Sequence, residues 1–278
     1  MGFYFGTIGE IIRKSLNAGY LLNIIFVMLL SIVLIGVSIA IVAFPAILLI
    51  ASVIGTGFSL TTLIILAVLA VVFFLLMALV QAVSSGIALH IAKQYYSNES
   101  ISFGKAWGNA KPRIMALFKV NFIVSILVLI VVLILAFPLI LSIISLAKAG
   151  SSLNFAQGIG AVLSIIGSAL LSVFLIFLFF LIFLPFFYLI NQTALFENAS
   201  AIGSIRIAWH YARKNYFMNW LLAVLFVLFI MIVFGIVFFI RINLGPLGFV
   251  LELIFSVWSG ALSYLFYFKL YQINAERG

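Results

Sequence analysis

The sequence predicts an all-α, polytopic transmembrane bundle of six membrane-spanning helices, arranged as three hairpins that each follow a short amphipathic interfacial helix. Three observations carry this prediction. The chain of 278 residues is 67% hydrophobic and only 7% charged, whereas a soluble domain carries about 25% charged residues. Its apolar runs are long enough to cross a bilayer and continuous rather than alternating, which favours helices over a barrel. Its basic residues cluster on one side of these runs.

The spans follow from the charge-free runs. No charged residue lies between Lys14 and Lys93, which leaves room for two helices at about 20–50 and 60–92 with a turn at 55–57. A re-entrant segment at 45–59 would give the same orientation. The second pair is expected at 120–146 and 160–190, with a polar turn at 148–157. The third pair is expected at 220–240 and 249–268, joined by a loop at 241–246.

Twelve of the fourteen cations lie on one side of the predicted spans, and only Lys148 and Arg241 lie on the other. Cytoplasmic loops are the ones enriched in Lys and Arg. The sequence therefore predicts a multi-pass protein of the cell membrane with both termini in the cytoplasm.

The chain repeats itself. The Ala-Phe-Pro stretch at 43–45 recurs at 136–138, each in the first helix of a pair, where proline is expected to kink the helix. Small, aromatic and basic residues recur before each pair, with Ala-Trp at 106–107 and again at 208–209. We therefore expect one integral membrane domain over 1–278, built from repeats at about 1–96, 97–195 and 196–278.

Three stretches carry a resemblance to a known family: Ser-Phe-Gly-Lys-Ala-Trp at 102–107, Pro-Phe-Phe-Tyr at 185–188, and Ala-Ile-Gly-Ser-Ile-Arg-Ile-Ala-Trp at 201–209. In these the chain resembles the membrane domain fused to some bacterial glycerophosphodiester phosphodiesterases and its stand-alone relatives. The resemblance implies six helices. It implies no phosphodiesterase activity, because the chain has no aspartate for that metal-dependent chemistry.

The residue inventory disfavours an enzyme. There is no cysteine and no aspartate, the five glutamates are scattered, and His90 and His210 stand far from any carboxylate cluster. Hydrolytic and metal sites need such groups in clusters. We expect no cofactor, no metal site and no catalytic residue. Because the cations flank apolar spans, they are assigned to topology and anionic lipids, and no nucleic-acid partner is expected.

Two sets of residues are the functional candidates. The first set would hold lipid headgroups, because it places cations beside aromatic residues in the predicted interfacial segments; it comprises Arg13, Lys14, Lys111, Arg113, Arg213 and Lys214. The second set would form an intramembrane polar site; it comprises Glu252, Arg241, Gln81 and Asn191. A structural ion pair between Arg241 and Glu252, and amides that cross-link helices, are the simpler accounts of the second set.

The preferred interpretation is a non-enzymatic structural or accessory subunit that contacts anionic lipid headgroups. Its partners would be membrane lipids and, in addition, other membrane-protein subunits or a second copy of the chain. The alternative is a transporter or channel for a small solute or ion, with a path near Glu252, Gln81 and Asn191.

Overall fold

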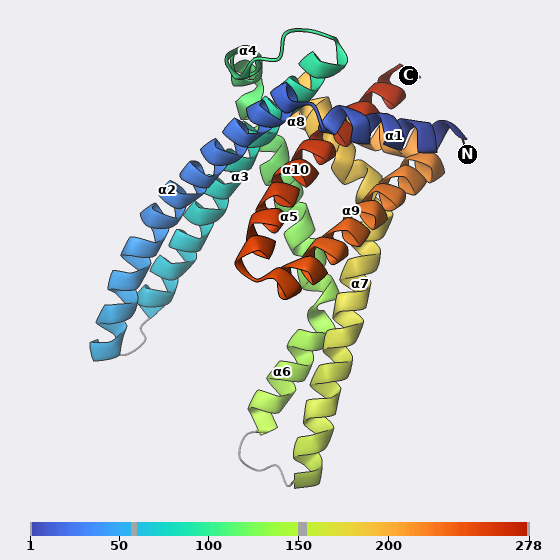
Figure 1. Cartoon of the computed structure of the whole chain (residues 1–278). Helices are drawn as coiled ribbons and strands as arrows, with labels where there is room; N and C mark the ends of the chain where they lie inside the picture. The colour runs from blue at the N-terminus through green and yellow to red at the C-terminus, as the bar shows by residue number, and fades with distance from the viewer. Residues whose placement is uncertain (1, 57–59, 150–154, 277–278) are drawn as a thin grey trace. The chain divides into compact units, whose positions relative to one another are not determined.

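The computed structural model describes residues 2–56, 60–149 and 155–276, and its regular structure within these ranges is helical throughout (Figure 1). The predicted all-α class is therefore confirmed. The helices are α1 (Gly2–Ser15), α2 (Ala18–Thr56), α3 (Leu60–Tyr96), α4 (Phe103–Ala110), a short 3-10 turn η1 (Lys111–Arg113), α5 (Ile114–Leu135), α6 (Phe137–Ala149), α7 (Phe155–Phe196), α8 (Ala201–Lys214), α9 (Tyr216–Leu244) and α10 (Pro246–Ala275).

Within the described residues, six stretches of helix are long and apolar enough to cross a bilayer, which confirms the predicted number of spans and makes the chain an integral membrane protein. They are Ala18–Ile47, Ile64–Tyr96, Phe103–Leu135, Ile159–Phe196, Tyr216–Leu244 and Pro246–Ala275. The short helices α1 and α8 come before the first and third hairpins, whereas the short helix α4 forms the start of the stretch Phe103–Leu135. The three-repeat organisation and the cytoplasmic position of the termini remain predictions.

The last turn is tighter than the sequence suggests. The loop expected at 241–246 shrinks to Gly245 alone, with a φ of +55° that glycine adopts without a steric penalty. A Cβ on Gly248 would clash with the backbone of Arg241, so the two helices need a glycine here as well. In the turn expected at 55–57, Gly55 and Thr56 belong to helix α2 instead. Gly57 and residues 150–154 of the expected second turn lie outside the described residues.

The two repeated prolines behave differently. Helix α2 passes through Pro45 without interruption, so the described part of the suggested re-entrant segment, 45–56, is continuous helix. At the second Ala-Phe-Pro stretch, helix α5 ends at Leu135, and α6 begins at Phe137 with Pro138 as its second residue. A proline at a helix start costs little, because its missing N–H would have no partner there. The predicted single span at 120–146 is therefore two helices.

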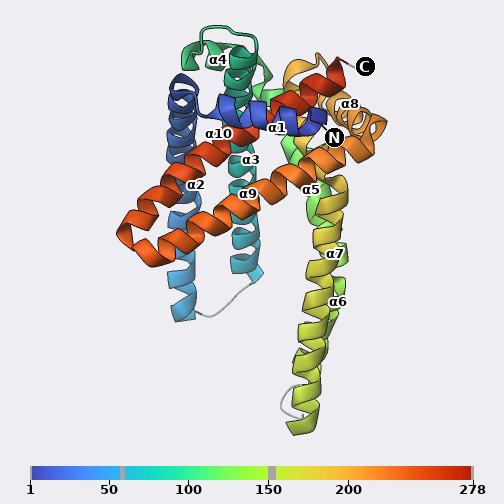
Figure 2. The same cartoon turned by 45° about the vertical axis from the view of Figure 1, so that its right-hand side comes forward.

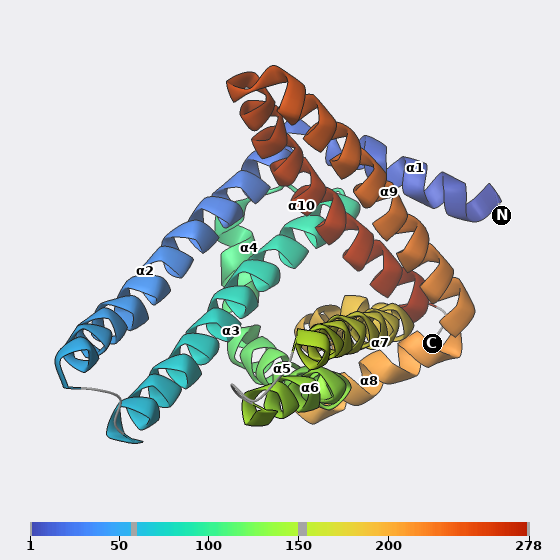
Figure 3. The ribbon, with the colours of Figure 1, turned by 90° about the horizontal axis from the view of Figure 1, so that it is seen from below.

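The chain divides into two compact units. Unit 1 comprises Met1–Phe122 and Phe186–Gly278, and unit 2 comprises Ile123–Pro185. Unit 2 holds most of α5, all of α6 and the larger part of α7, which runs alongside α6 (Figures 1 and 3). The boundaries of the two units do not coincide with those of the predicted repeats.

Helix α10 is the centre of unit 1. It packs against α9, α3, α2 and α1, and it crosses the α2–α3 hairpin in Figure 2. The Tyr20 hydroxyl of α2 donates to the backbone oxygen of Ala261 in α10 at 2.8 Å. Helix α3 approaches α5 so closely that a Cβ on Gly86 would lie 3.1 Å from Leu117 Cδ1.

The buried residues of unit 1 gather toward one end of its long helices, which we call the packed end. It comprises residues 81–96 of α3, 187–196 of α7 and 261–275 of α10, together with α1, α4 and α8. By the distribution of cations, the sequence predicts that the packed end faces the cytoplasm.

Candidate functional site

A cavity of about 360 Å³ lies within the packed end of unit 1. Three helices form it, and each contributes polar side chains. The lining residues are Gln81, Ser84, Ser85 and Leu89 of α3, Phe187, Tyr188, Asn191 and Gln192 of α7, and Tyr264 and Tyr267 of α10.

Helical spacing places these side chains on common faces. Gln81, Ser84 and Ser85 are related by i, i+3 and i+4, and so are Tyr188, Asn191 and Gln192. Tyr264 and Tyr267 are three residues apart on α10. Residues three and four apart are neighbours on a helix surface. Each of the three helices therefore places a row of polar side chains in the cavity lining.

The lining combines hydroxyl and amide groups with a larger apolar and aromatic surface, and it carries no charged side chain. Its aromatic rings are held in fixed contact: the Tyr188 and Tyr267 rings stack with centroids 4.8 Å apart, and the Tyr264 and Tyr267 rings meet edge to face at 6.1 Å. Such pairs restrict the rotation of each ring. The cavity therefore combines rigid π faces with hydroxyl and amide groups.

The hydrogen bonds inside the cavity leave acceptors unused. Ser84 and Ser85 donate their protons to the backbone oxygens of Val80 and Gln81 on their own helix. Asn191 Oδ1 and Gln192 Oε1 are buried and have no hydrogen-bond partner among the described residues. Bulk water cannot supply one to Gln192, because that residue is only 1% exposed. Buried polar atoms are nearly always paired in folded proteins.

The predicted intramembrane polar set is divided by the structure. Gln81 and Asn191 come together in the cavity lining. Arg241 and Glu252 do not line it; they form an ion pair with each other at 2.6 Å beside the α9–α10 turn. The pairing itself was expected, but the path joining all four residues is absent from the described part of the chain.

Amides elsewhere in the packed end cross-link helices. Asn219 and Asn274 are each 2% exposed and exchange hydrogen bonds, with Nδ2 to Oδ1 distances of 3.1 and 3.0 Å. Asn219 also donates to the backbone oxygen of Tyr211, at 3.0 Å. These contacts join α9 and α10 and hold the end of α8 against both.

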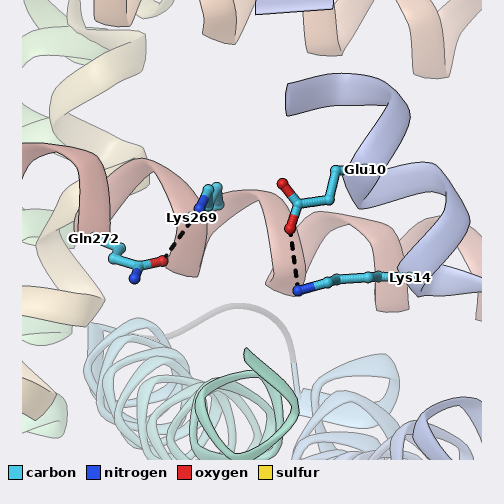
Figure 4. A network of polar contacts seen from close by, with 4 residues as sticks. All are labelled: Glu10, Lys14, Lys269 and Gln272. Carbon is cyan, nitrogen blue, oxygen red and sulfur yellow. Dashed lines mark hydrogen bonds and ion pairs between the residues drawn. The ribbon is translucent and has the colours of Figure 1, made fainter. Parts of the chain in front are cut away.

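A second group of polar contacts lies at the packed end (Figure 4). Lys14 pairs with Glu10 at 3.1 Å and lies 4.0 Å from the Tyr96 ring centroid. Lys269 lies 5.4 Å from the same ring and donates to Gln272 at 3.4 Å. Lys14 was predicted to hold a lipid phosphate, but its ammonium group already has a carboxylate and a ring as partners.

Helix α8 presents two distinct faces. Ser204, Ala208 and Ala212 are buried, and the backbone oxygen of Ser204 accepts from Thr193 of α7. Its exposed residues mix bulky apolar side chains with cations: Ile202, Arg206, Trp209, Arg213 and Lys214. Ile202 is 68% and Trp209 is 46% exposed.

The position of α8 is fixed at both of its ends. At its start, Ser200 Oγ accepts from the Gly203 N–H, an N-cap that fixes the first turn. Near its end, Tyr211 donates to Glu197, which also accepts from Tyr271 of α10. Burial and the hydrogen bond to Glu197 raise the pKa of Tyr211, so this phenol keeps the proton it donates.

The other predicted headgroup residues differ in exposure. Arg13, at the end of α1, and Lys111, in η1, are exposed. Arg113 is half-buried and donates to Asn198 Oδ1. Arg13, Lys111, Arg213 and Lys214 are thus exposed, and Lys14 and Arg113 are half-buried.

Sequence reasoning missed most of the cavity. It singled out Gln81 and Asn191 but assigned no site role to Ser84, Ser85, Tyr188, Tyr264 or Tyr267. The available signal was the i, i+3, i+4 spacing of polar residues on three separate helices. It could not show that these three helices would meet.

No protein-family model, curated protein or solved structure matches the chain. The resemblance to the membrane domain of the phosphodiesterases is therefore still a prediction, carried by the sequence stretches alone.

Proposed function

We propose that this integral membrane protein is a non-enzymatic accessory or structural subunit that binds anionic lipid headgroups through the exposed face of α8. The observation that carries the proposal is the composition of that face. Arg206, Arg213 and Lys214 stand beside Ile202 and Trp209 on one helix whose opposite face is buried.

The physical reason lies in the two parts of the lipid interface. An exposed Trp and Ile on a surface helix bury apolar area at the boundary between headgroups and acyl chains. Each Lys or Arg near an anionic surface contributes about 1 kcal/mol of attraction. Arginine also binds phosphate in a bidentate manner, which a lysine cannot reproduce. Arg13 and Lys111 would extend the same contact to two further short segments.

The test compares lipid retention. The protein is reconstituted in nanodiscs of equal parts phosphatidylglycerol and phosphatidylcholine, released into the gas phase, and its retained lipids are counted by native mass spectrometry. We expect wild-type protein to retain phosphatidylglycerol preferentially. A triple variant, Arg206→Gln, Arg213→Gln and Lys214→Gln, should lose most of that preference.

Lys148→Gln is the charge control, because Lys148 lies on α6, at the side of the spans opposite to most of the cations by sequence. It should retain the wild-type preference. If the triple variant and the control keep the same preference for phosphatidylglycerol, α8 does not bind headgroups and the proposal is wrong.

A second function, transport of a small solute, is favoured by one observation, the polar cavity at the packed end. The cavity residues and the Arg241–Glu252 pair are separate, so Glu252→Gln separates two cases. Loss of a measured flux in folded protein would support a path through this pair. Unchanged flux would restrict any solute site to the cavity.

A further inference from the structure

The cavity carries an inference that goes beyond lipid contact at α8 and uses none of its residues. We propose that the cavity between α3, α7 and α10 is a binding site for a small, uncharged, hydroxyl-rich molecule of polyol or sugar type. Such a molecule can arrive free in water or as the headgroup of a lipid.

The first argument concerns the oxygens of two lining amides. Asn191 and Gln192 line the cavity, and Asn191 Oδ1 and Gln192 Oε1 have no hydrogen-bond partner among the described residues. An unpaired buried polar group costs about 1–3 kcal/mol, so a ligand that donates a hydrogen bond to it recovers part of that free energy. Ser85 Oγ donates its proton to a backbone oxygen and offers a further acceptor site, whereas Ser84 Oγ, which also donates to a backbone oxygen, already accepts from Ser31.

The second argument is the absence of charge. No Lys, Arg, His or Glu is among the lining residues, and an anion would lose its hydration without a cationic partner. A cation would find no carboxylate in the lining, and the charged residues that follow the cavity residues on α3 and α10 are Lys93 and Lys269. Glu197 follows on α7, but its carboxylate accepts from two tyrosines.

The third argument is shape and surface. Tyr188, Tyr264 and Tyr267 offer fixed ring faces, against which the C–H face of a sugar ring or an inositol can pack, and phenol oxygens at their rims. Hydroxyl groups both donate and accept, so they suit amides, phenols and serines together. A volume of about 360 Å³ is in the range of small-molecule sites.

The absence of cysteine from the chain provides a clean test. Ser85→Cys places the only thiol of the protein in the cavity, where it is labelled with the small uncharged reagent methyl methanethiosulfonate. The protein is held in nanodiscs of phosphatidylethanolamine and phosphatidylserine and kept free of sugar detergents. The probes are glycerol, myo-inositol, glucose and octyl glucoside, with choline and phosphate for comparison.

We expect at least one uncharged probe to slow labelling of Ser85→Cys tenfold or more at saturation, while choline and phosphate have no effect. Protection by free polyols indicates a water-borne ligand, and protection by octyl glucoside alone indicates a lipid headgroup. Asn191→Cys is a second reporter from α7 in case the first variant does not fold. Ser38→Cys on α2 is the matched control: it is equally buried, does not line the cavity, and should gain no protection.

A further variant tests the recognition chemistry. Gln192→Met keeps the volume of the side chain but removes its acceptor. The concentration of the protecting probe that gives half-maximal protection should therefore rise tenfold or more. Protection by choline or phosphate alone, or by no probe at all, would overturn the proposal. Because α8 is untouched, this failure would leave the lipid-retention result as it stands, and the converse also holds.

Discussion

The two halves of α3 are both helical, but their composition and their surroundings differ. In its first half, residues such as Val68 are open to the surroundings, with 56% of Val68 exposed. In its second half, Ile87, Ala88 and Ile91 are all 0% exposed. Helix α3 is therefore exposed in its first half and packed into the core of unit 1 in its second half.

Side-chain size and polarity both differ between the two halves. The first half is mostly Leu, Ile, Val and Phe, whereas residues 82–88 include two alanines, two serines and a glycine, and Gln81, His90 and Gln94 stand in the same half. Lipid tails are as apolar as Leu, so burial of apolar surface does not drive helices together in a bilayer. Small residues let backbones approach closely, and the close packing then holds the helices together. Small and polar residues together therefore mark the packed end.

The largest expected effect comes from filling the closest approach. Gly86→Leu at the packed end should destabilise the protein by about 3 kcal/mol, because the new side chain meets Leu117 and Ala110. Gly36→Leu on α2 is the matched control, since a Cβ there has open space around it. Thermal unfolding in detergent, followed by tryptophan fluorescence, measures both. Equal midpoints for the two variants would remove the distinction between packed and lipid-facing positions.

A smaller effect is expected from the buried amide pair. Asn219→Leu leaves Asn274 without its partner and should cost about 1–3 kcal/mol. The double variant with Asn274→Leu should cost less than the two single changes added together, because no orphan remains. Asn243→Leu is the control at the far end of α9, where the side chain is exposed and bonds only its own helix. A fully additive cycle would show that the two amides act independently.

The cavity predicts a gain rather than a loss. Gln192→Met should stabilise the unliganded protein by about 1 kcal/mol, because it removes an unpaired buried oxygen without opening a void. The neighbouring Thr193→Val should destabilise it, because the Thr193 hydroxyl is hydrogen-bonded to backbone oxygens of α7 and α8. Destabilisation by Gln192→Met of the same size would mean that Gln192 is a structural residue.

The smallest effect is expected at the Arg241–Glu252 pair. The two side chains are 43% and 21% exposed, so water screens the pair and Glu252→Gln should cost less than about 1 kcal/mol. The loss should shrink further at high salt, which unfolding midpoints at two ionic strengths will show. A large loss of stability that does not depend on salt would indicate that the pair is shielded from water and stabilises more than the α9–α10 turn.

The fold could be predicted because its signals are local in the sequence. Charge-free runs give the six spans, and proline and glycine give the breaks, although the helices extend further than the apolar windows. The break before Pro138 and the continuity through Pro45 were not separable, since both prolines stand in the same Ala-Phe-Pro context. Whether a helix resumes after a proline depends on packing.

The candidate site was only partly predictable. Gln81 and Asn191 stand out as amides in apolar runs, but tyrosines are common near membrane boundaries and attract no notice there. The Lys14–Glu10 pair is local, since the two residues are four apart on one helix. The partner of Arg113, Asn198, lies far away in the chain and could not be found from the sequence. Such distant contacts also decide which polar residues meet in the cavity lining.

Spin labels on cysteines introduced along α3 would test the central claim most directly. A label at Val68→Cys and another at Ser85→Cys are compared for collision with oxygen, which partitions into lipid, and with a water-soluble nickel chelate. We expect strong oxygen collision and almost no nickel collision at position 68, with the preference reversed at position 85. Equal accessibility to oxygen at both positions, with no nickel collision at position 85, would contradict a polar cavity in the packed end.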